Sequence, residues 1–213
     1  MSAKRGIEAV VFDVGRVLFQ WDLRHLFAKL IDDRQELEWF VSHVVTEAWH
    51  HDHDAGRDLG EMVAERKQAF PGHAHLIDAY ATRFEESITG PVPGSLELVA
   101  RLDAAGLPLF AITNFADAFW TRFRAAQPVF GHFRDIVVSG TEKLAKPDPA
   151  IFRLAARRFA VDPAASLFID DNPANIAAAE ALGWQVHLFH DAAALEADLV
   201  ARGLLPAWSS AIA

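Results

Sequence analysis

The apolar positions of the chain form five short runs, separated by longer stretches in which apolar residues recur at helical spacing. The runs cover residues 8–12, 108–113, 135–138, 166–170 and 184–189. Helical spacing covers residues 115–126, 149–159 and 173–182. Strands that alternate with helices in this way indicate a parallel sheet with crossover helices. The nearly continuous apolar character of 109–112 fits a strand buried on both faces. The pattern therefore predicts an α/β fold with a parallel five-stranded sheet flanked by helices.

A long segment without strand signals separates the first two predicted strands. Residues 22–88 show helical spacing throughout, and the glycine- and proline-rich stretch 90–94 ends the pattern. A helix predicted over 95–105 then leads into the second strand, with Gly106 just past its end. An insertion of about 65 residues is far longer than a simple crossover. We therefore predict a helical cap over 19–91, inserted into a core formed by 1–18 and 92–213.

Composition and charge narrow the class of protein. The chain has 213 residues, of which 52% are hydrophobic, enough for one domain with a sizeable insertion. The net charge of −9 argues against a nucleic-acid or anionic-membrane partner. The absence of cysteine excludes disulfides and thiol nucleophiles. Because the start lacks a secretory apolar segment and no run is long enough to cross a membrane, we expect a cytoplasmic protein.

Polar residues stand at or after four of the predicted elements, where the carboxyl ends of parallel strands meet at one sheet edge. These residues are Asp13, the pair Thr113-Asn114, Lys146, and the pair Asp170-Asp171. Each alone could be a helix cap or a solvated loop residue. Because capping four times over at one edge is a poor explanation, the combination favours a functional site.

The residue types indicate phosphoryl chemistry. Asp13 and Asp170 offer the hard oxygen ligands that suit Mg²⁺. Asp13 could attack phosphorus and form an aspartyl phosphate. Lys146, Thr113 and backbone N–H groups could hold the phosphoryl oxygens as charge develops on them.

Four segments resemble the motifs of the haloacid dehalogenase-like superfamily, in the same order along the chain. They are Phe12-Asp13-Val14-Gly15-Arg16-Val17-Leu18, Ile112-Thr113-Asn114, Lys146-Pro147-Asp148-Pro149, and Ile169-Asp170-Asp171-Asn172 with Asn175. The insertion stands where the C1 subclass of that superfamily has its cap. Asp-x-Gly in the first motif and Asp-Asp-Asn-x-x-Asn in the fourth are most similar to the bacterial glucose-1-phosphatase-like branch.

The resemblance implies a Rossmann-like core and Mg²⁺-dependent hydrolysis of a small phosphorylated metabolite, such as a sugar phosphate, with Asp13 as nucleophile. It implies metal ligands from Asp13, the backbone carbonyl of Gly15, Asp170 and Asp171. It implies phosphate contacts from Val14, Gly15, Thr113, Asn114 and Lys146, with Thr113 and Lys146 also assisting catalysis.

Gly15 departs from the pattern that the resemblance would give. In most phosphatases of the superfamily an aspartate at this place protonates the leaving group, which glycine cannot do. Arg16 is also unusual, because glycine or asparagine is common there. We therefore expect substrates whose leaving groups need little protonation, such as anomeric sugar phosphates or aryl phosphates, since general-acid help is worth roughly 10²–10⁴-fold where it is needed.

Two alternatives to a phosphatase follow from Gly15. The dehalogenase branch also lacks an aspartate at this place, and there Asp13 would attack carbon without a metal. The paired acids Asp170-Asp171 argue against that reading, because paired acids suit a metal site. The second alternative is a catalytically weak protein that binds a phospho-ligand or a protein partner.

A cluster of histidines marks the predicted cap. His50, His51 and His53 stand among Trp49, Asp52 and Asp54. They could form a transition-metal site, contact the substrate or supply the missing acid, or simply belong to a solvated helix end. Residues 19–22 are a candidate hinge into the cap.

Overall fold

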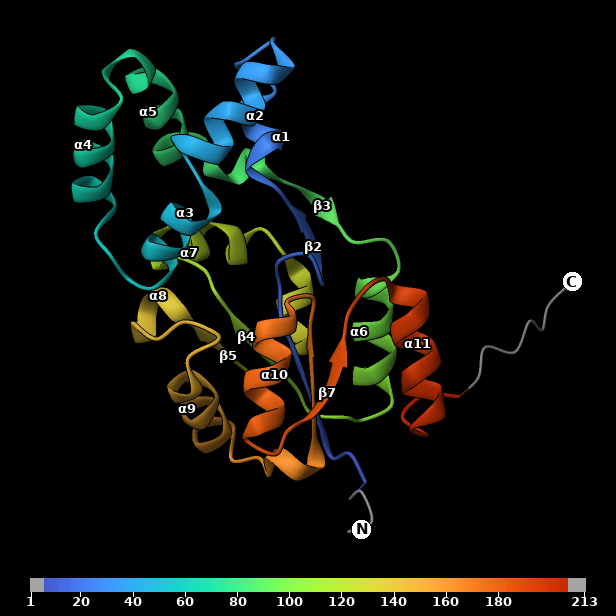
Figure 1. Cartoon of the computed structure of the whole chain (residues 1–213). Coiled ribbons are helices and arrows are strands. Elements are labelled where there is room, and N and C mark those ends of the chain that lie inside the picture. The colour runs from blue at the N-terminus through green and yellow to red at the C-terminus, as the bar shows by residue number, and fades with distance from the viewer. Residues whose placement is uncertain (1–5, 207–213) are drawn as a thin grey trace, which may run out of the picture.

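A parallel five-stranded sheet forms the centre of the molecule, in a computed structural model that describes residues 6–206 (Figure 1). Residues 1–5, where we expected no signal segment, and 207–213 lie outside the described residues. The strand order is β5-β4-β1-β6-β7. The strands are β1 (Ala9–Phe12), β4 (Leu109–Thr113), β5 (Asp135–Val138), β6 (Ser166–Asp170) and β7 (Gln185–Leu188). The predicted α/β fold and its five strands are confirmed.

Helices cover both faces of this sheet because its strands are apolar on both sides. Val10 and Phe12 of β1 pack in one hydrophobic cluster with α6 (Ser95–Ala104) and α11 (Ala192–Ala201). Ala9 and Val11 point the other way and pack with α9 (Pro149–Phe159) and α10 (Pro173–Ala181). In Figure 1 these two helix pairs lie on opposite sides of the strands. The sheet is thus the middle layer of a three-layer α/β core.

The predicted core helices are confirmed, with one shifted start. α7 (Asp117–Ala125) begins two residues later than expected, because Phe115 and Ala116 continue in extended form after β4. The Phe115 N–H donates to Ser139 Oγ, 2.9 Å away. A short helix, α8 (Ser139–Glu142), follows β5, and the 3₁₀ helices η3 (Pro128–His132) and η4 (Pro163–Ala165) complete the core.

Residues 19–91, which we call the insertion, leave the core after β1. They contain α1 (Leu23–Phe27), α2 (Arg34–His43), α3 (Glu47–Asp54), α4 (Leu59–Ala69), η1 (Pro71–His73), α5 (Ala74–Arg83) and η2 (Phe84–Ser87). Helices were expected over 22–88, and the helical part ends one residue earlier, because Ile88 begins a strand. β2 (Phe19–Trp21) and β3 (Ile88–Pro91) pair antiparallel and join the insertion to the core as a two-stranded ribbon.

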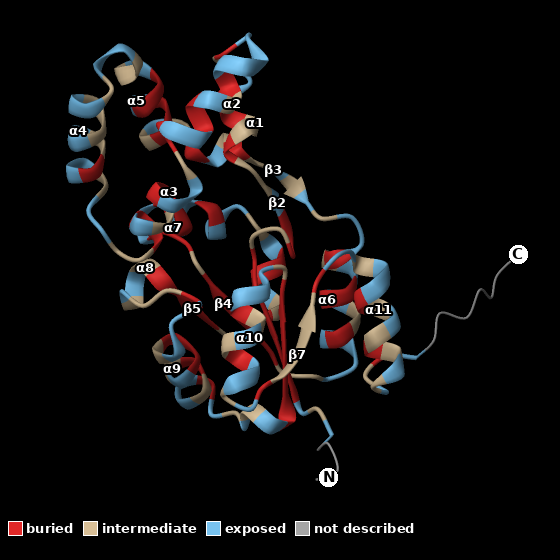
Figure 2. Cartoon of the chain, viewed as in Figure 1, coloured by how far each residue is buried: buried red, intermediate tan, exposed pale blue. Residues whose placement is uncertain are grey.

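The insertion packs on the core rather than standing apart from it. Its Leu26 and Phe40 belong to the same hydrophobic cluster as Val10 and Phe12 of the sheet. Figure 2 shows buried residues along the strands and on the inner sides of the insertion helices. The Ser139 hydroxyl of α8 donates to the Asp54 carbonyl at the end of α3, 2.5 Å away. This contact holds α3 beside the core. No helix among the described residues is long and apolar enough to cross a membrane.

Candidate active site

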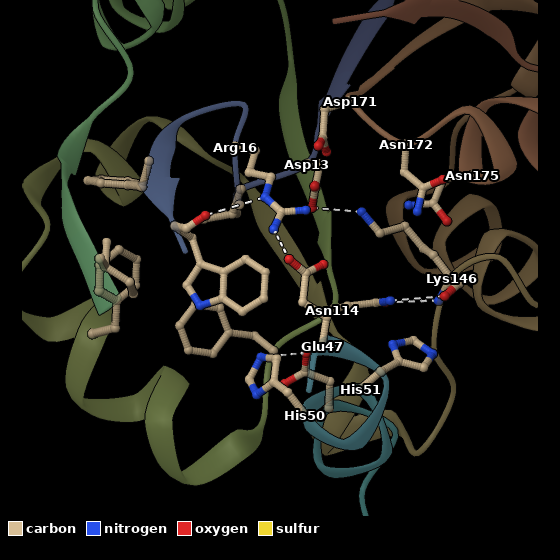
Figure 3. Close-up of a pocket in the computed structure, with 18 of the residues that line it drawn as sticks. Asp13, Arg16, Glu47, His50, His51, Asn114, Lys146, Asp171, Asn172 and Asn175 are labelled. Carbon is tan, nitrogen blue, oxygen red and sulfur yellow. Dashed lines mark hydrogen bonds and ion pairs between the residues drawn. The ribbon is translucent and has the colours of Figure 1, made fainter. Parts of the chain in front are cut away.

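The buried side chain of Lys146 lies between two carboxylates at the carboxyl edge of the sheet. Figure 3 shows its contact with one of them, Asp13. Lys146 Nζ lies 2.7 Å from an Asp13 oxygen and 2.7 Å from an Asp170 oxygen. The Lys146 side chain is 1% exposed and that of Asp170 is fully buried. Burying a lysine is costly unless its charge is paired, and here two acids pair it. β1 is central, with β4 and β6 as neighbours, so the strand order itself brings Asp13 next to Thr113 and Asp170.

Asp170 is fixed by its own neighbours. One of its oxygens accepts from the Asn172 N–H at 2.8 Å, and both accept from Asn175 Nδ2 at 3.0 Å. Asp170 does not cap α10, because the Asn172 side chain does so by accepting from the Ala174 N–H at 2.9 Å. These hydrogen bonds therefore fix the Asp170 carboxylate in the site, and it takes no part in capping α10.

Asn114 holds the loop that carries Lys146. Its amide nitrogen donates to the Lys146 carbonyl at 2.9 Å, and its amide oxygen accepts from the Lys146 N–H at 2.8 Å. We predicted Asn114 as a phosphate contact. The structure gives both ends of its amide a backbone partner, so its observed part is to position Lys146. The side chain still lines the cavity described below.

Two polar atoms beside the charged centre are buried without a hydrogen-bond partner: Thr113 Oγ1 and Asn175 Oδ1. A buried hydroxyl without a partner costs free energy, so such atoms are rare unless a ligand or solvent satisfies them. Thr113 lies at the end of β4, next to β1. Its hydroxyl is therefore suited to a ligand oxygen, which is the role that the sequence predicted for it.

Three of the carboxylates that were predicted as ligands could together hold a metal ion. Asp13, Asp170 and Asp171 each offer one oxygen, and these oxygens lie within 4.8 Å of one another. An all-oxygen, anionic donor set fits Mg²⁺. The fourth predicted ligand, the Gly15 carbonyl, stays a prediction, although Gly15 lines the same cavity.

The electrostatics also favour a cation here. Burial raises the pKa of Asp13 to about 7, and Asp170 and Asp171 add to the rise while Lys146 opposes it. Burial and Asp170 likewise raise the pKa of Asp171, against Arg16 and Lys146. The pKa of Lys146 is raised, because Asp13 and Asp170 together outweigh its burial. The single positive charge of Lys146 thus faces several clustered carboxylates. A divalent cation would offset the repulsion that remains between these carboxylates.

Arg16 links the first motif to the insertion. Its backbone is left-handed, with φ +60°, a conformation that glycine or asparagine adopts more easily. The guanidinium pairs with Glu47 of α3, and its Nε–H donates to the Trp21 carbonyl at 3.3 Å. The central carbon of the guanidinium, Cζ, lies 4.7 Å from the centroid of the Trp21 ring. The unusual residue at this place therefore joins the loop after Asp13 to two elements of the insertion.

A cavity of about 390 Å³ opens between the charged centre and the insertion. Asp13, Asn114, Lys146 and Asp171 line it from the core, together with Val14 and Gly15. From the insertion, it is lined by Phe19, Trp21, Glu47, Ala48, His50, His51, Asp54, Phe84 and Ile88. The nucleophile candidate thus faces a space large enough for a small organic ligand.

The clustered histidines do not converge on one point. His50 is buried, with Nδ1 2.6 Å from the Tyr80 hydroxyl and Nε2 3.2 Å from an Asp54 oxygen. His53 Nδ1 lies 2.9 Å from the Arg57 carbonyl, whereas His51 lines the cavity. Among the described residues, the three carboxylates above are the group that could hold a metal. The reading of the histidines as a transition-metal site is therefore not supported.

Sequence reasoning missed several residues of the cavity wall. Trp21 belongs to the candidate hinge 19–22, yet it lies on β2 and lines the cavity. Glu47 and Phe84 were not singled out at all. Glu47 is an acid at the start of a helix and Phe84 is an apolar residue in a helical pattern, and neither feature indicates a site by itself. Only their neighbourhood in space reveals them.

Comparisons with known proteins identify the family of this chain. Residues 7–183 match the family model described as haloacid dehalogenase-like hydrolase. The chain belongs to this family of hydrolases.

The chain is also similar to individual proteins and to solved structures. A solved HAD family enzyme of Bacteroides thetaiotaomicron, in complex with magnesium and inorganic phosphate, is similar with a TM-score of 0.66 and 22% identity, covering 87% of this chain and 96% of that one. A probable phosphoglycolate phosphatase of Pseudomonas putida is 29% identical over 63% of this chain and 49% of its own length. A sesquiterpene phosphatase of Aspergillus oryzae is 24% identical over 83% of this chain and 86% of its own length. This chain thus spans about half the length of the Pseudomonas relative.

Proposed function

We propose that this hydrolase is a Mg²⁺-dependent phosphatase that cleaves the phosphate monoester of a small metabolite through an aspartyl phosphate on Asp13. The observation that carries the proposal is the buried centre of Asp13, Lys146 and Asp170, with Asp171 completing a set of three carboxylates. Two relatives named as phosphatases, and the similar enzyme crystallised with magnesium and phosphate, support it.

The residues divide the reaction between them. An Asp13 oxygen attacks phosphorus, the bond from phosphorus to the ester oxygen breaks, and that oxygen leaves with the electron pair. Water then cleaves the aspartyl phosphate and restores the Asp13 carboxylate. Lys146 and the Thr113 hydroxyl would hold phosphoryl oxygens as charge develops on them. Mg²⁺, held by Asp13, Asp170, Asp171 and the Gly15 carbonyl, would neutralise the phosphate and the clustered acids.

A single substitution tests this function. Asp13→Asn keeps the size of the side chain and removes the nucleophile, so release of phosphate from 4-nitrophenyl phosphate should fall by at least about 10³-fold. Asp32→Asn, at an exposed position outside the cavity, is the matched control and should keep full activity. Chelation of Mg²⁺ should abolish turnover by the unaltered protein.

Other results would point to the alternatives. Chloride release from 2-chloropropionate without a metal would indicate a dehalogenase. A protein that binds phosphate with Mg²⁺ but turns over no ester would be a binding protein. Full activity of Asp13→Asn would remove the proposed mechanism.

A further inference from the structure

Aromatic rings form the part of the cavity that faces the charged centre from the insertion. The rings of Trp21 and His50 are stacked with centroids 5.0 Å apart and planes inclined by 27°. His50 stacks in turn on Phe84, at 5.0 Å and 22°. Phe84 stacks on Phe119 of α7, at 4.3 Å and 6°. The stack runs from the ribbon through α3 and η2 into the core, and three of its four rings line the cavity.

The wall is rigid because its central ring is fixed at both nitrogens. Burial, with Asp54 adding to it, raises the pKa of the Tyr80 hydroxyl well above its usual value, so this group stays protonated and can donate to His50 Nδ1. The other ring nitrogen of His50, Nε2, lies 3.2 Å from an Asp54 oxygen. His50 therefore presents ring carbons to a ligand and has no free nitrogen with which to protonate one. A wall held in place before binding loses little entropy when a ligand arrives.

The first motif supplies no side-chain acid for a leaving group, which leaves His51 as the imidazole of the cavity lining that could donate a proton. Gly15 has no side chain, and Glu47 is engaged as the partner of Arg16. An ester oxygen that can leave as an anion needs no such donor. Phenolates do this far more readily than alkoxides, because the ring delocalises the charge. A rigid aromatic wall and a missing acid point to the same kind of leaving group.

We propose, on the basis of the phosphatase function above, that the substrate is an aryl phosphate whose ring lies against Trp21, His50 and Phe84. The phosphate would face Lys146 and Asp13. The bond between phosphorus and the aryl oxygen breaks, the phenolate leaves with the electron pair, and it takes its proton from solvent. The faces of His50 and Phe84 are covered by their neighbours in the stack, so these rings offer their edges to a ligand. Edge-to-face contact between aromatic rings is favourable. The cavity of about 390 Å³ has room for one ring and a phosphate.

Binding is tested with phosphonates, which cannot be hydrolysed. Phenylphosphonate should compete with 4-nitrophenyl phosphate at least about tenfold better than methylphosphonate does, in the presence of Mg²⁺. Trp21→Ala and Phe84→Leu should each reduce this ratio to about threefold or less, whereas Trp21→Phe should largely keep it. Trp39→Ala is the matched control, because Trp39 is a tryptophan of the insertion that is 41% exposed and lies outside the cavity wall.

Turnover is tested with a panel of esters that have rings of similar size. Phenyl phosphate should be hydrolysed about 10²-fold faster than benzyl phosphate or cyclohexyl phosphate, because the last two release alkoxides without acid help. Equal rates across the panel would overturn the proposal, as would equal inhibition by the two phosphonates. Failure of the phosphatase function looks different: no ester would release phosphate, while calorimetry would still detect the preference for phenylphosphonate.

Discussion

The two sides of the cavity are built on different principles. On the core side, Asp13 directly follows β1, and Thr113 and Asp170 end the adjacent strands β4 and β6. Lys146 joins them from a loop that Asn114 holds. On the insertion side, the rings come from a ribbon, a helix and a 3₁₀ turn. Backbone topology sets the first group, whereas side-chain packing sets the second. The comparison indicates that the chemistry belongs to the sheet edge and the choice of substrate to the insertion.

The largest effect on stability is expected when the buried lysine of the core side is replaced. Lys146→Met leaves Asp13 and Asp170 buried without a counter-charge, which should destabilise the protein by about 3–5 kcal/mol near neutral pH. Urea unfolding measures the change. Lys67→Met is the control, because Lys67 pairs with Asp78 on the surface and should contribute less than about 1 kcal/mol. Similar losses for the two variants would contradict the account of a buried, paired charge.

The Asp13 carboxyl should make stability depend on pH in the metal-free protein. Its pKa rises from 3.8 to about 7 on folding, so the folded state binds this proton more tightly than the unfolded state. The contribution of this proton to the free energy of unfolding is full below pH 3.8 and is lost as the pH rises through 7. Its upper bound is on the order of 4 kcal/mol. Asp13→Asn cannot titrate, so its stability relative to the unaltered protein should increase from pH 4.5 to 8. A constant difference in urea unfolding would contradict this, and Mg²⁺ should oppose the trend.

A smaller effect should come from restoring an acid on the core side. Gly15→Asp should speed hydrolysis of benzyl phosphate about tenfold or more, and that of phenyl phosphate much less, because only the alkoxide needs a proton. A Cβ at position 15 would meet no atom within 4 Å, so the change should be tolerated. Gly15→Asn adds the same bulk without the acid and is the control. If both variants give the same rates on both esters, proton supply does not limit turnover.

The sequence allowed most of the core side to be predicted. Strands such as 166–170 are short, apolar and bounded by turn residues, and their carboxyl ends must meet in a parallel sheet. Asp13, Thr113, Lys146 and Asp170 could therefore be assigned to one place. The hydrogen-bond partners of these residues could not be predicted. A hydrogen bond such as that from Asn114 to the Lys146 carbonyl depends on loop geometry that no periodicity encodes.

The insertion side was largely beyond prediction. β2 and β3 are very short, and β3 contains Gly90 and Pro91, which signal a turn. The ring stack joins residues 21, 50, 84 and 119, which are far apart in the chain. Local patterns report which residues are apolar, but not which of them meet. The histidines illustrate this limit, since His50 and His51 are adjacent in sequence and have different surroundings.

The position of Trp21 gives the protein a built-in optical probe. Its indole stacks on an imidazole and lies beside a guanidinium, and its Nε1 is buried without a hydrogen-bond partner. Indole fluorescence responds to such neighbours and to the polarity around the ring. Among the tryptophans of residues 6–206, Trp21 is the one that lines the cavity. The difference in emission between the unaltered protein and Trp21→Phe should therefore report occupancy of the cavity directly, without a label and without turnover.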